Sequence, residues 1–169
     1  SENIVLVYHL LGSGISSTLY AQRFDSDGNS LWSSPTQLSN KTTAFIRNYD
    51  GANDGDVVYY GYYASSGTRF DSYLQRINPD GTLPWGINGS DFDTSQARNE
   101  METAISFNAG SDFIWSVCTY RDSSQGNSGE YIQKFDIQTG ERQFTDSGKQ
   151  VFDVGSDNVH AGGLQLFED

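Results

Sequence analysis

Three stretches of β-branched and aromatic residues recur along the chain, and polar turn-forming residues follow each of them. The stretches cover residues 4–8, 57–63 and 113–118, and the Gly, Ser and Asn clusters that follow lie at residues 12–14, 65–67 and 125–129. Short apolar runs of this kind predict β-strands, and a Gly/Ser/Asn loop between two strands predicts a hairpin. The pattern therefore predicts an all-β chain.

The strand after each loop carries a repeated motif. Residues 20–24 read Tyr-Ala-Gln-Arg-Phe, residues 73–77 read Tyr-Leu-Gln-Arg-Ile, and residues 131–135 read Tyr-Ile-Gln-Lys-Phe. Asp-Gly follows the first two copies at residues 27–28 and 80–81, and it predicts a tight hairpin because glycine adopts positive φ without steric cost. An aromatic residue then opens the next strand in each copy: Trp32, Trp85 and Phe144.

The spacing of the motif defines the units. The central glutamines, Gln22, Gln75 and Gln133, give a period of about 55 residues. Short opening strands are expected at residues 44–46 and 104–107, ahead of the second and third runs, and residues 161–166 resemble the opening strand of a fourth unit. We therefore expect about twelve strands, with four antiparallel strands in each unit.

These units divide the chain into one all-β repeat region that covers residues 1–169. Repeat 1 covers about residues 1–40, repeat 2 about 41–98, repeat 3 about 99–156, and a fourth begins at 157–169. The expectation is that the chain is a fragment of a larger protein.

Alternation within the motif strand places Tyr20 and Gln22 on one face and Ala21 and Arg23 on the other. Apolar residues on both faces predict sheets that are packed on both sides, as in radially stacked blades. The repeated glutamines are interpreted as side chains that bond buried backbone groups between neighbouring sheets, because buried polar groups are paired.

The motif Tyr-Ala-Gln-Arg-Phe-Asp-x-Asp-Gly-x-x-x-Trp, after an apolar strand and a loop, resembles the propeller-type repeats of secreted and cell-surface proteins of Bacteroidetes. Many of those proteins are exported by the type IX secretion route. The resemblance covers nearly the whole chain, and it implies propeller blades and a secreted or cell-surface location. The third copy departs from the motif at Lys134 and Phe144.

Two architectures remain open from the sequence. Propellers close with at least four blades, so three units would need an oligomer or a partner chain to complete a ring. A β-trefoil closes with three four-stranded units, but its units are usually shorter than these. Propeller blades are the favoured prediction.

Charge narrows the choice of partners. The formal net charge is −12, from 10 Lys and Arg against 22 Asp and Glu. This balance disfavours nucleic acid, which is bound by clustered basic groups, and no apolar run is long enough for membrane insertion. The expected partners are protein or carbohydrate. The one cysteine, Cys118, lies in an apolar run and is expected to be a buried small hydrophobe.

No catalytic residue is predicted. The chain contains no Gly-x-Ser-x-Gly elbow, and its two histidines, His9 and His160, lie near opposite ends. Glycosidase chemistry needs two carboxylates across a scissile bond, and the sequence places no such pair. Whether the protein is an enzyme stays open, with a non-enzymatic role favoured.

Calcium is the one cofactor considered. Asp50, Asp54 and Asp56 lie among glycines in a segment rich in oxygen ligands, as calcium loops do. Ala52 stands at a position where such a loop needs a ligand, so a plain turn is the favoured interpretation and no other cofactor is expected.

Four tyrosines form the candidate ligand-binding surface: Tyr59, Tyr60, Tyr62 and Tyr63. Strand alternation sends some of them outward, where aromatic rings can bind sugars or proteins. Packing between adjacent sheets is the favoured alternative. The leading functional hypothesis is a non-catalytic extracellular scaffold or binding module that engages protein or glycan through its blade loops. The alternative is a fragment of a carbohydrate-active propeller enzyme.

Overall fold

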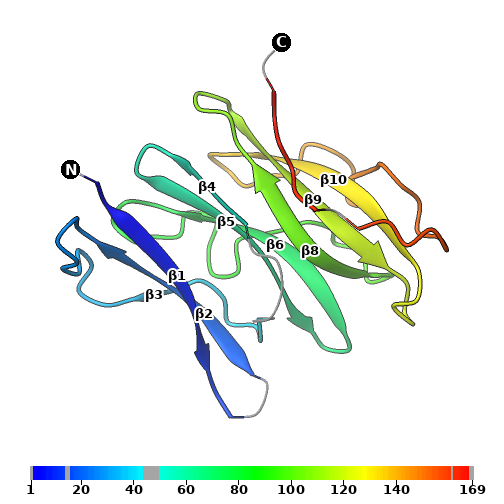
Figure 1. Ribbon diagram of the computed structural model, residues 1–169, viewed down its shortest axis with the longest axis horizontal. Helices are drawn as coiled ribbons and strands as arrows, with labels where there is room; N and C mark the ends of the chain where they lie inside the picture. Colours follow the sequence, from blue (N-terminus) through cyan, green and yellow to red (C-terminus); the bar gives the residue numbers. More distant parts are fainter. Residues whose placement is uncertain (1, 14–15, 44–49, 161, 168–169) are drawn as a thin grey trace.

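The computed structural model describes residues 2–13, 16–43, 50–160 and 162–167. These residues form eleven strands in three antiparallel sheets and contain no helix (Figure 1). The all-β prediction is confirmed. No helix in the described ranges is therefore long and apolar enough to cross a membrane.

Strands that are consecutive in the sequence are neighbours in each sheet. Sheet 1 contains β1 (Ile4–Leu11), β2 (Ser17–Phe24) and β3 (Thr36–Gln37). Sheet 2 contains β4 (Asp50–Asp54), β5 (Val57–Ser66), β6 (Arg69–Ile77) and β7 (Ser90–Asp91). Sheet 3 contains β8 (Asn99–Ser106), β9 (Phe113–Arg121), β10 (Ser128–Asp136) and β11 (Lys149–Gln150).

The apolar runs and the motif strands form hairpins, as predicted. They are the pairs β1/β2, β5/β6 and β9/β10, and in each pair the motif tyrosine lies opposite the strand before it. The strands expected to open at Trp32, Trp85 and Phe144 begin four or five residues later and are only two residues long.

The opening strands differ from expectation. Residues 44–46 lie outside the described residues, and the strand expected at 104–107 begins earlier, at Asn99. Residues 162–166, expected as the opening strand of a fourth unit, form an irregular segment because no described strand pairs with them.

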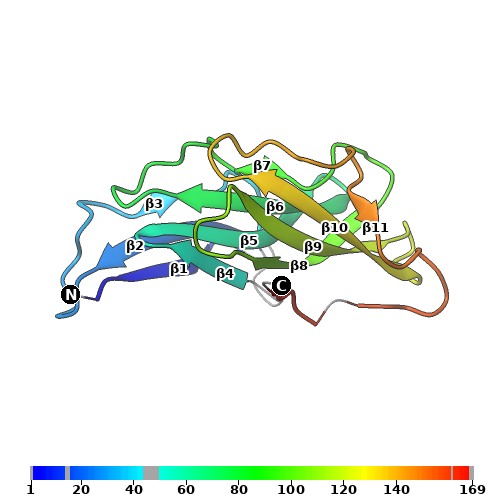
Figure 2. The ribbon, with the colours of Figure 1, turned by 90° about the horizontal axis from the view of Figure 1, so that it is seen from above.

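The three sheets form an open row, with sheet 2 between sheets 1 and 3 (Figure 1). Strands β1, β4 and β8 lie along one side of the row, and the short strands β3, β7 and β11 lie toward the other (Figure 2). The described sheets are not closed into a ring.

Apolar side chains fill both gaps between sheets. Leu19 and Ala21 of β2 pack with Tyr73 and Ile77 of β6 in the first core. Leu74, from the opposite face of β6, belongs to the second core. Both faces of sheet 2 are therefore buried, and the expected packing on two sides is confirmed for this sheet.

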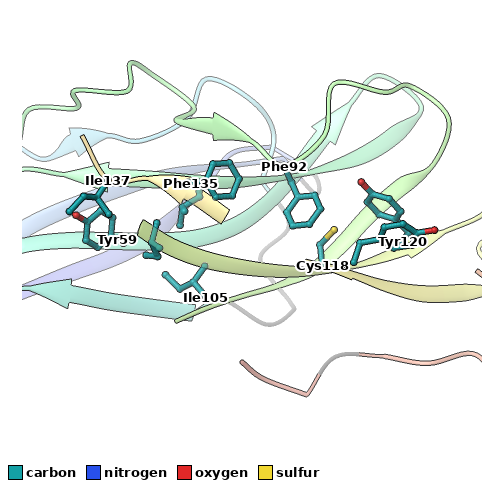
Figure 3. Close-up of a cluster of buried hydrophobic side chains, with 10 residues drawn as sticks. Tyr59, Phe92, Ile105, Cys118, Tyr120, Phe135 and Ile137 are labelled. Carbon is teal, nitrogen blue, oxygen red and sulfur yellow. The ribbon is translucent and has the colours of Figure 1, made fainter. Parts of the chain in front are cut away.

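The second core lies between sheets 2 and 3 (Figure 3). It includes Tyr59, Phe92, Ile105 and Phe135, together with Cys118, which is fully buried and has no disulfide partner. Burial raises the pKa of the Cys118 thiol. The prediction that this cysteine is a buried small hydrophobe is confirmed.

The three motif glutamines bond main-chain groups, and Gln75 does so between neighbouring units, as the sequence predicts, whereas Gln22 and Gln133 bond groups of their own units. Gln22 Nε2 donates to Trp32 O at 3.3 Å, and Gln133 Nε2 donates to Thr145 O at 3.0 Å. Gln75 also reaches the preceding unit, where its Nε2 donates to Leu38 O at 3.3 Å. Within each unit, the buried glutamine amide thus joins the motif strand to the segment that precedes β3, β7 or β11.

Candidate functional site

The three aspartates considered for calcium do not converge. Asp50 and Asp54 stand at opposite ends of β4, so the segment is a strand rather than a ligand loop. Asp50 Oδ2 accepts a hydrogen bond from Ile105 N at 3.0 Å, and Asp56 Oδ1 lies 2.6 Å from Arg23 Nη2. Within the described ranges, no group of three His, Cys, Asp or Glu residues could hold a metal ion. Asp50 and Asp56 therefore join neighbouring units.

Three of the four candidate tyrosines lie in the interior. Tyr59, Tyr62 and Tyr63 are at most 2% exposed, and Tyr60 is half-buried. Tyr62 stacks on Tyr73 with ring centroids 5.5 Å apart, and its hydroxyl donates to a main-chain carbonyl. Burial raises the pKa of Tyr62. Tyr59 and Tyr62 pack in the two cores between sheets, and Tyr63 packs against Phe70, so the three buried rings offer no exposed platform for a sugar.

The arginine and tryptophan of the first unit bond the turn of the second. Arg23 Nη1 and Trp32 Nε1 both donate to Pro79 O, each at 2.9 Å. Thr36 Oγ1 donates to Gly81 O in the same turn at 3.0 Å. A Cβ on Gly81 would lie 3.1 Å from the Trp32 ring, so glycine is what allows this approach. We call this set of donors, an arginine, a tryptophan and a hydroxyl on a turn, the clasp.

The second unit repeats the clasp on the third. Arg76 Nη1 donates to Ile137 O, and Trp85 Nε1 donates to the next carbonyl at 3.3 Å. Ser90 Oγ donates to Gly140 O at 2.7 Å, in the same role as the threonine of the first clasp. The repeated Arg and Trp are therefore joining residues, and the sequence motif marks contacts between units.

The third unit replaces every donor of the clasp. Lys134 and Phe144 stand at the arginine and tryptophan positions, and Lys149 stands at the hydroxyl position in the strand register. Lys134 Nζ lies 4.3 Å from the ring centroid of Phe113, and Lys149 Nζ lies 4.4 Å from that of Phe144. This end of the row therefore presents lysines over aromatic rings, a cation–π arrangement, instead of a clasp.

Paired glycine substitutions test the clasp. Gly28 and Gly140 both have positive φ, but a Cβ meets nothing within 4 Å at Gly28 and lies 2.9 Å from Trp85 at Gly140. We expect Gly28→Ala to cost about 1–2 kcal/mol through backbone strain alone. Gly140→Ala should cost roughly a further 1–3 kcal/mol because it also forces the indole away. Urea unfolding measures both, and equal costs would contradict the clasp.

The structure brings together a serine, a histidine and a glutamate that are far apart in the sequence. His160 Nδ1 lies 2.9 Å from Glu102 Oε2, and His160 Nε2 lies 3.3 Å from Ser128 Oγ. Arg121 Nη2 donates to Glu102 Oε1 at 2.9 Å. Burial would raise the pKa of Glu102, but the bonds from His160, Thr119 and Arg121 hold it below its usual value.

This constellation has the order of a nucleophile, a base and an orienting acid, but the serine is covered. Ser128 is 2% exposed, and a Cβ on the adjacent Gly129 would lie 2.5 Å from the main chain of Asp153. A substrate carbonyl has no approach to Ser128 Oγ through that segment. The network instead fastens the chain around residues 153–160 to sheet 3. The sequence carries no local motif for it, because Glu102 and His160 are 58 residues apart.

Removal of the histidine should release this segment. We expect His160→Ala to increase protease cleavage within residues 150–160 several-fold, because local opening exposes the chain to the protease. Asp157→Ala, at an exposed position beside the network, serves as the matched control and should leave the cleavage rate unchanged. Mass spectrometry of the fragments identifies the cut, and equal rates in the two variants would refute the tether.

Several carboxyl groups are buried where sheet 2 meets sheet 3. Ser72 N donates to Glu100 Oε2 at 3.1 Å, and Tyr120 Oη donates to Asp93 Oδ2 at 2.7 Å. Burial raises the pKa of Glu100 to about 9, with the nearby carboxylates adding to the effect, and it raises the pKa of Asp91 to about 6. At neutral pH, Glu100 is therefore protonated and hydrogen-bonded inside the junction.

Stability should depend on the charge of Glu100. The pKa of Glu100 in the folded chain lies above the ordinary 4.5. The stabilisation that this carboxyl group contributes to the folded state is therefore complete below pH 4.5 and is lost as pH rises toward 9. We expect Glu100→Gln to flatten this decline. Between pH 5 and pH 8.5, the free energy of unfolding of the variant should rise by on the order of 1 kcal/mol or more relative to that of the native chain. The amide oxygen can still accept from Ser72 N. Urea unfolding at the two pH values measures the gain, and the exposed Glu141→Gln should keep the native slope.

The comparisons with known proteins give little resemblance. No family model matches the chain, and no curated protein matches it. A solved structure described as "Glycoside hydrolase" is similar over 89% of this chain, with 13% sequence identity and a TM-score of 0.46. The matched region spans 38% of that structure's chain.

Proposed function

We propose that this chain is a non-catalytic scaffold and binding module built from propeller-type units, which engages protein or glycan through the loops at its unit junctions. The observation that carries the proposal is the clasp. The most distinctive side chains of the repeat, two Arg–Trp pairs, bond main-chain groups of the next unit. Such use supports a joining role rather than a catalytic one.

The arrangement of the units favours propeller-type blades over the β-trefoil. Each unit has a sheet of its own, and the sheets pack face to face through two apolar cores. Stacked sheets of this kind are typical of propeller blades. The secreted or cell-surface location that the repeat resemblance implies is part of the same proposal.

The junctions offer repeated surface pockets for a ligand. The pocket at the first clasp has a volume of about 640 Å³ and is lined by Arg23, Trp32, Ser34 and Asp80, among others. The pocket at the second clasp, of about 410 Å³, includes Arg142 and Phe144. An aromatic ring beside hydroxyl, carboxylate and guanidinium groups suits a sugar or a polar protein loop.

A pocket-filling variant tests this function. We expect a glycan array or a panel of purified surface proteins to reveal a ligand, with no hydrolysis of a polysaccharide panel. Ser34→Trp fills the first junction pocket and should weaken binding of that ligand about tenfold or more by steric exclusion. Ser123→Trp, in an exposed loop outside both junction pockets, should bind as the native chain does.

Two results would contradict the proposal. One is hydrolysis of a polysaccharide by the purified chain. The other is the absence of any ligand in both screens.

A further inference from the structure

One face of sheet 1 is exposed, whereas the equivalent faces of sheets 2 and 3 are buried. The strand registers align Tyr20 with Tyr73 and Tyr131, which are 4% and 6% exposed, whereas Tyr20 is only half-buried. On the same face of β1, Leu6 and Leu10 are 50% and 58% exposed. A contiguous apolar face on a soluble domain marks an interaction surface.

The edge of the same sheet is also open. In sheets 2 and 3, β4 and β8 pair with the strands equivalent to β1, but no described strand pairs with the outer edge of β1. A free edge presents a row of unpaired main-chain donors and acceptors, which is a template for another strand. Sheet 1 therefore lacks, among the described residues, the opening strand that completes the other two sheets.

The opposite end of the row carries an irregular segment that pairs with no described strand. Residues 162–167 lie beside β8, where Leu166 N donates to Ser106 Oγ at 3.2 Å (Figure 2). In the same way, Ile105 N of β8 donates to Asp50 Oδ2 of β4. A hydrogen bond thus joins the segment to the first strand of sheet 3, as another joins β8 to the first strand of sheet 2. Phe167 is 83% exposed, so the segment presents an apolar side chain that a partner could cover.

The two ends also carry opposite charges. Lys134 and Lys149 occupy the clasp positions of the third unit, and Asp25 and Asp27 lie in the turn of the first. A Cβ on Gly28 of that turn would meet nothing within 4 Å, whereas tryptophan covers the equivalent glycines of the other two turns. Within the described part of the chain, the turn at residues 25–28 lacks the donors that a preceding unit would provide, and Lys134 and Lys149 stand where the third unit would contact a following turn.

We propose that two copies of this chain bind head to tail, where the head is the outer edge of β1 with the turn at residues 25–28, and the tail is residues 162–167 with Lys134 and Lys149. Residues 162–167 of one copy pair with the outer edge of β1 in its partner and complete sheet 1, and Lys134 and Lys149 approach the acidic turn at residues 25–28. A head-to-tail contact forms a closed ring when its rotation closes, and the proposal is that two copies, each with one head and one tail, make both contacts and close on each other. This proposal deepens the proposed scaffold, because it names a second copy as a partner.

A charge swap tests the contact. The tail variant carries Lys134→Glu and Lys149→Glu. The head variant carries Ser26→Lys and Asp27→Lys, and it retains Asp25 because that carboxylate bonds Asp27 N and Asn29 N within the turn. Like charges then face each other at both contacts in either variant alone, whereas an equimolar mixture restores opposite charges at both.

Light scattering at about 100 µM chain gives the readout, since this concentration detects dissociation constants in the micromolar range. The native chain should have the mass of a dimer, each variant that of a monomer, and the mixture that of a dimer again. Circular dichroism confirms that every variant is folded. Any of three results would overturn the proposal. They are a native chain that is monomeric, charge-reversed variants that are still dimeric, and an equimolar mixture that does not regain the mass of a dimer.

A second pair of variants tests the apolar face. Leu6→Lys should abolish the dimer, because it places a charge on the face that the partner covers. Ile87→Lys substitutes a residue that is 46% exposed in a loop of the second unit, and it should leave the dimer intact. Loss of the dimer in both variants, or in neither, would contradict the assigned surface. A monomeric chain that still binds its ligand would overturn the head-to-tail contact and leave the proposed scaffold standing.

Discussion

The spacing between neighbouring sheets depends on a guanidinium and an indole that bond the main chain of the next hairpin turn. Apolar cores provide most of the driving force for stacking, but hydrophobic contact is not directional and would allow the sheets to slide. Arg23 contributes direction, because its planar group reaches Pro79 O and Asp56 at the same time. A hydrogen bond to a charged group contributes about 1.5–3 kcal/mol, so two clasps matter in a domain with marginal stability.

A second set of polar contacts connects β8 to the sheet before it. Thr103 Oγ1 donates to Tyr62 O at 3.1 Å and lies 2.8 Å from Ser72 Oγ. Together with the Ser72–Glu100 bond, these contacts satisfy polar groups that the junction buries. Strand β8 is thus shared: it pairs with β9 in its own sheet and packs across β4, β5 and β6 of sheet 2. Loss of a partner would leave a buried group unpaired, which fixes one register for the two sheets.

The sequence predicts the long hairpins because their signals are local. Alternation in residues 20–24 and the Asp-Gly turns depend on a few neighbouring residues, and the strands form where these signals lie. Pairing between distant segments overrides weaker local signals. Asp50–Asp54 has the composition of a loop, yet it is extended because it pairs with β5.

The remaining differences between the sequence-based predictions and the structure arise from burial and from long-range contacts. The tyrosines of β5 look like a surface platform until sheets 1 and 3 cover both faces of the strand. The acceptors of the clasp are main-chain carbonyls, which have no signature in a sequence. His160 meets Glu102 only after three sheets have formed, so no local spacing could indicate that network.

The substitutions in the third unit affect all three clasp positions together, which a solvent-exposed end would not require. A lysine cannot reproduce the planar fork of arginine, so this end cannot hold a turn at the fixed spacing of the internal junctions. It can attract an acidic turn over a range of distances, at a strength that salt reduces. Such a contact suits two chains that must find each other in solution, whereas the rigid clasp suits units already joined by the same chain. The difference between arginine and lysine at one position of the repeat is therefore consistent with a change from intramolecular to intermolecular stacking.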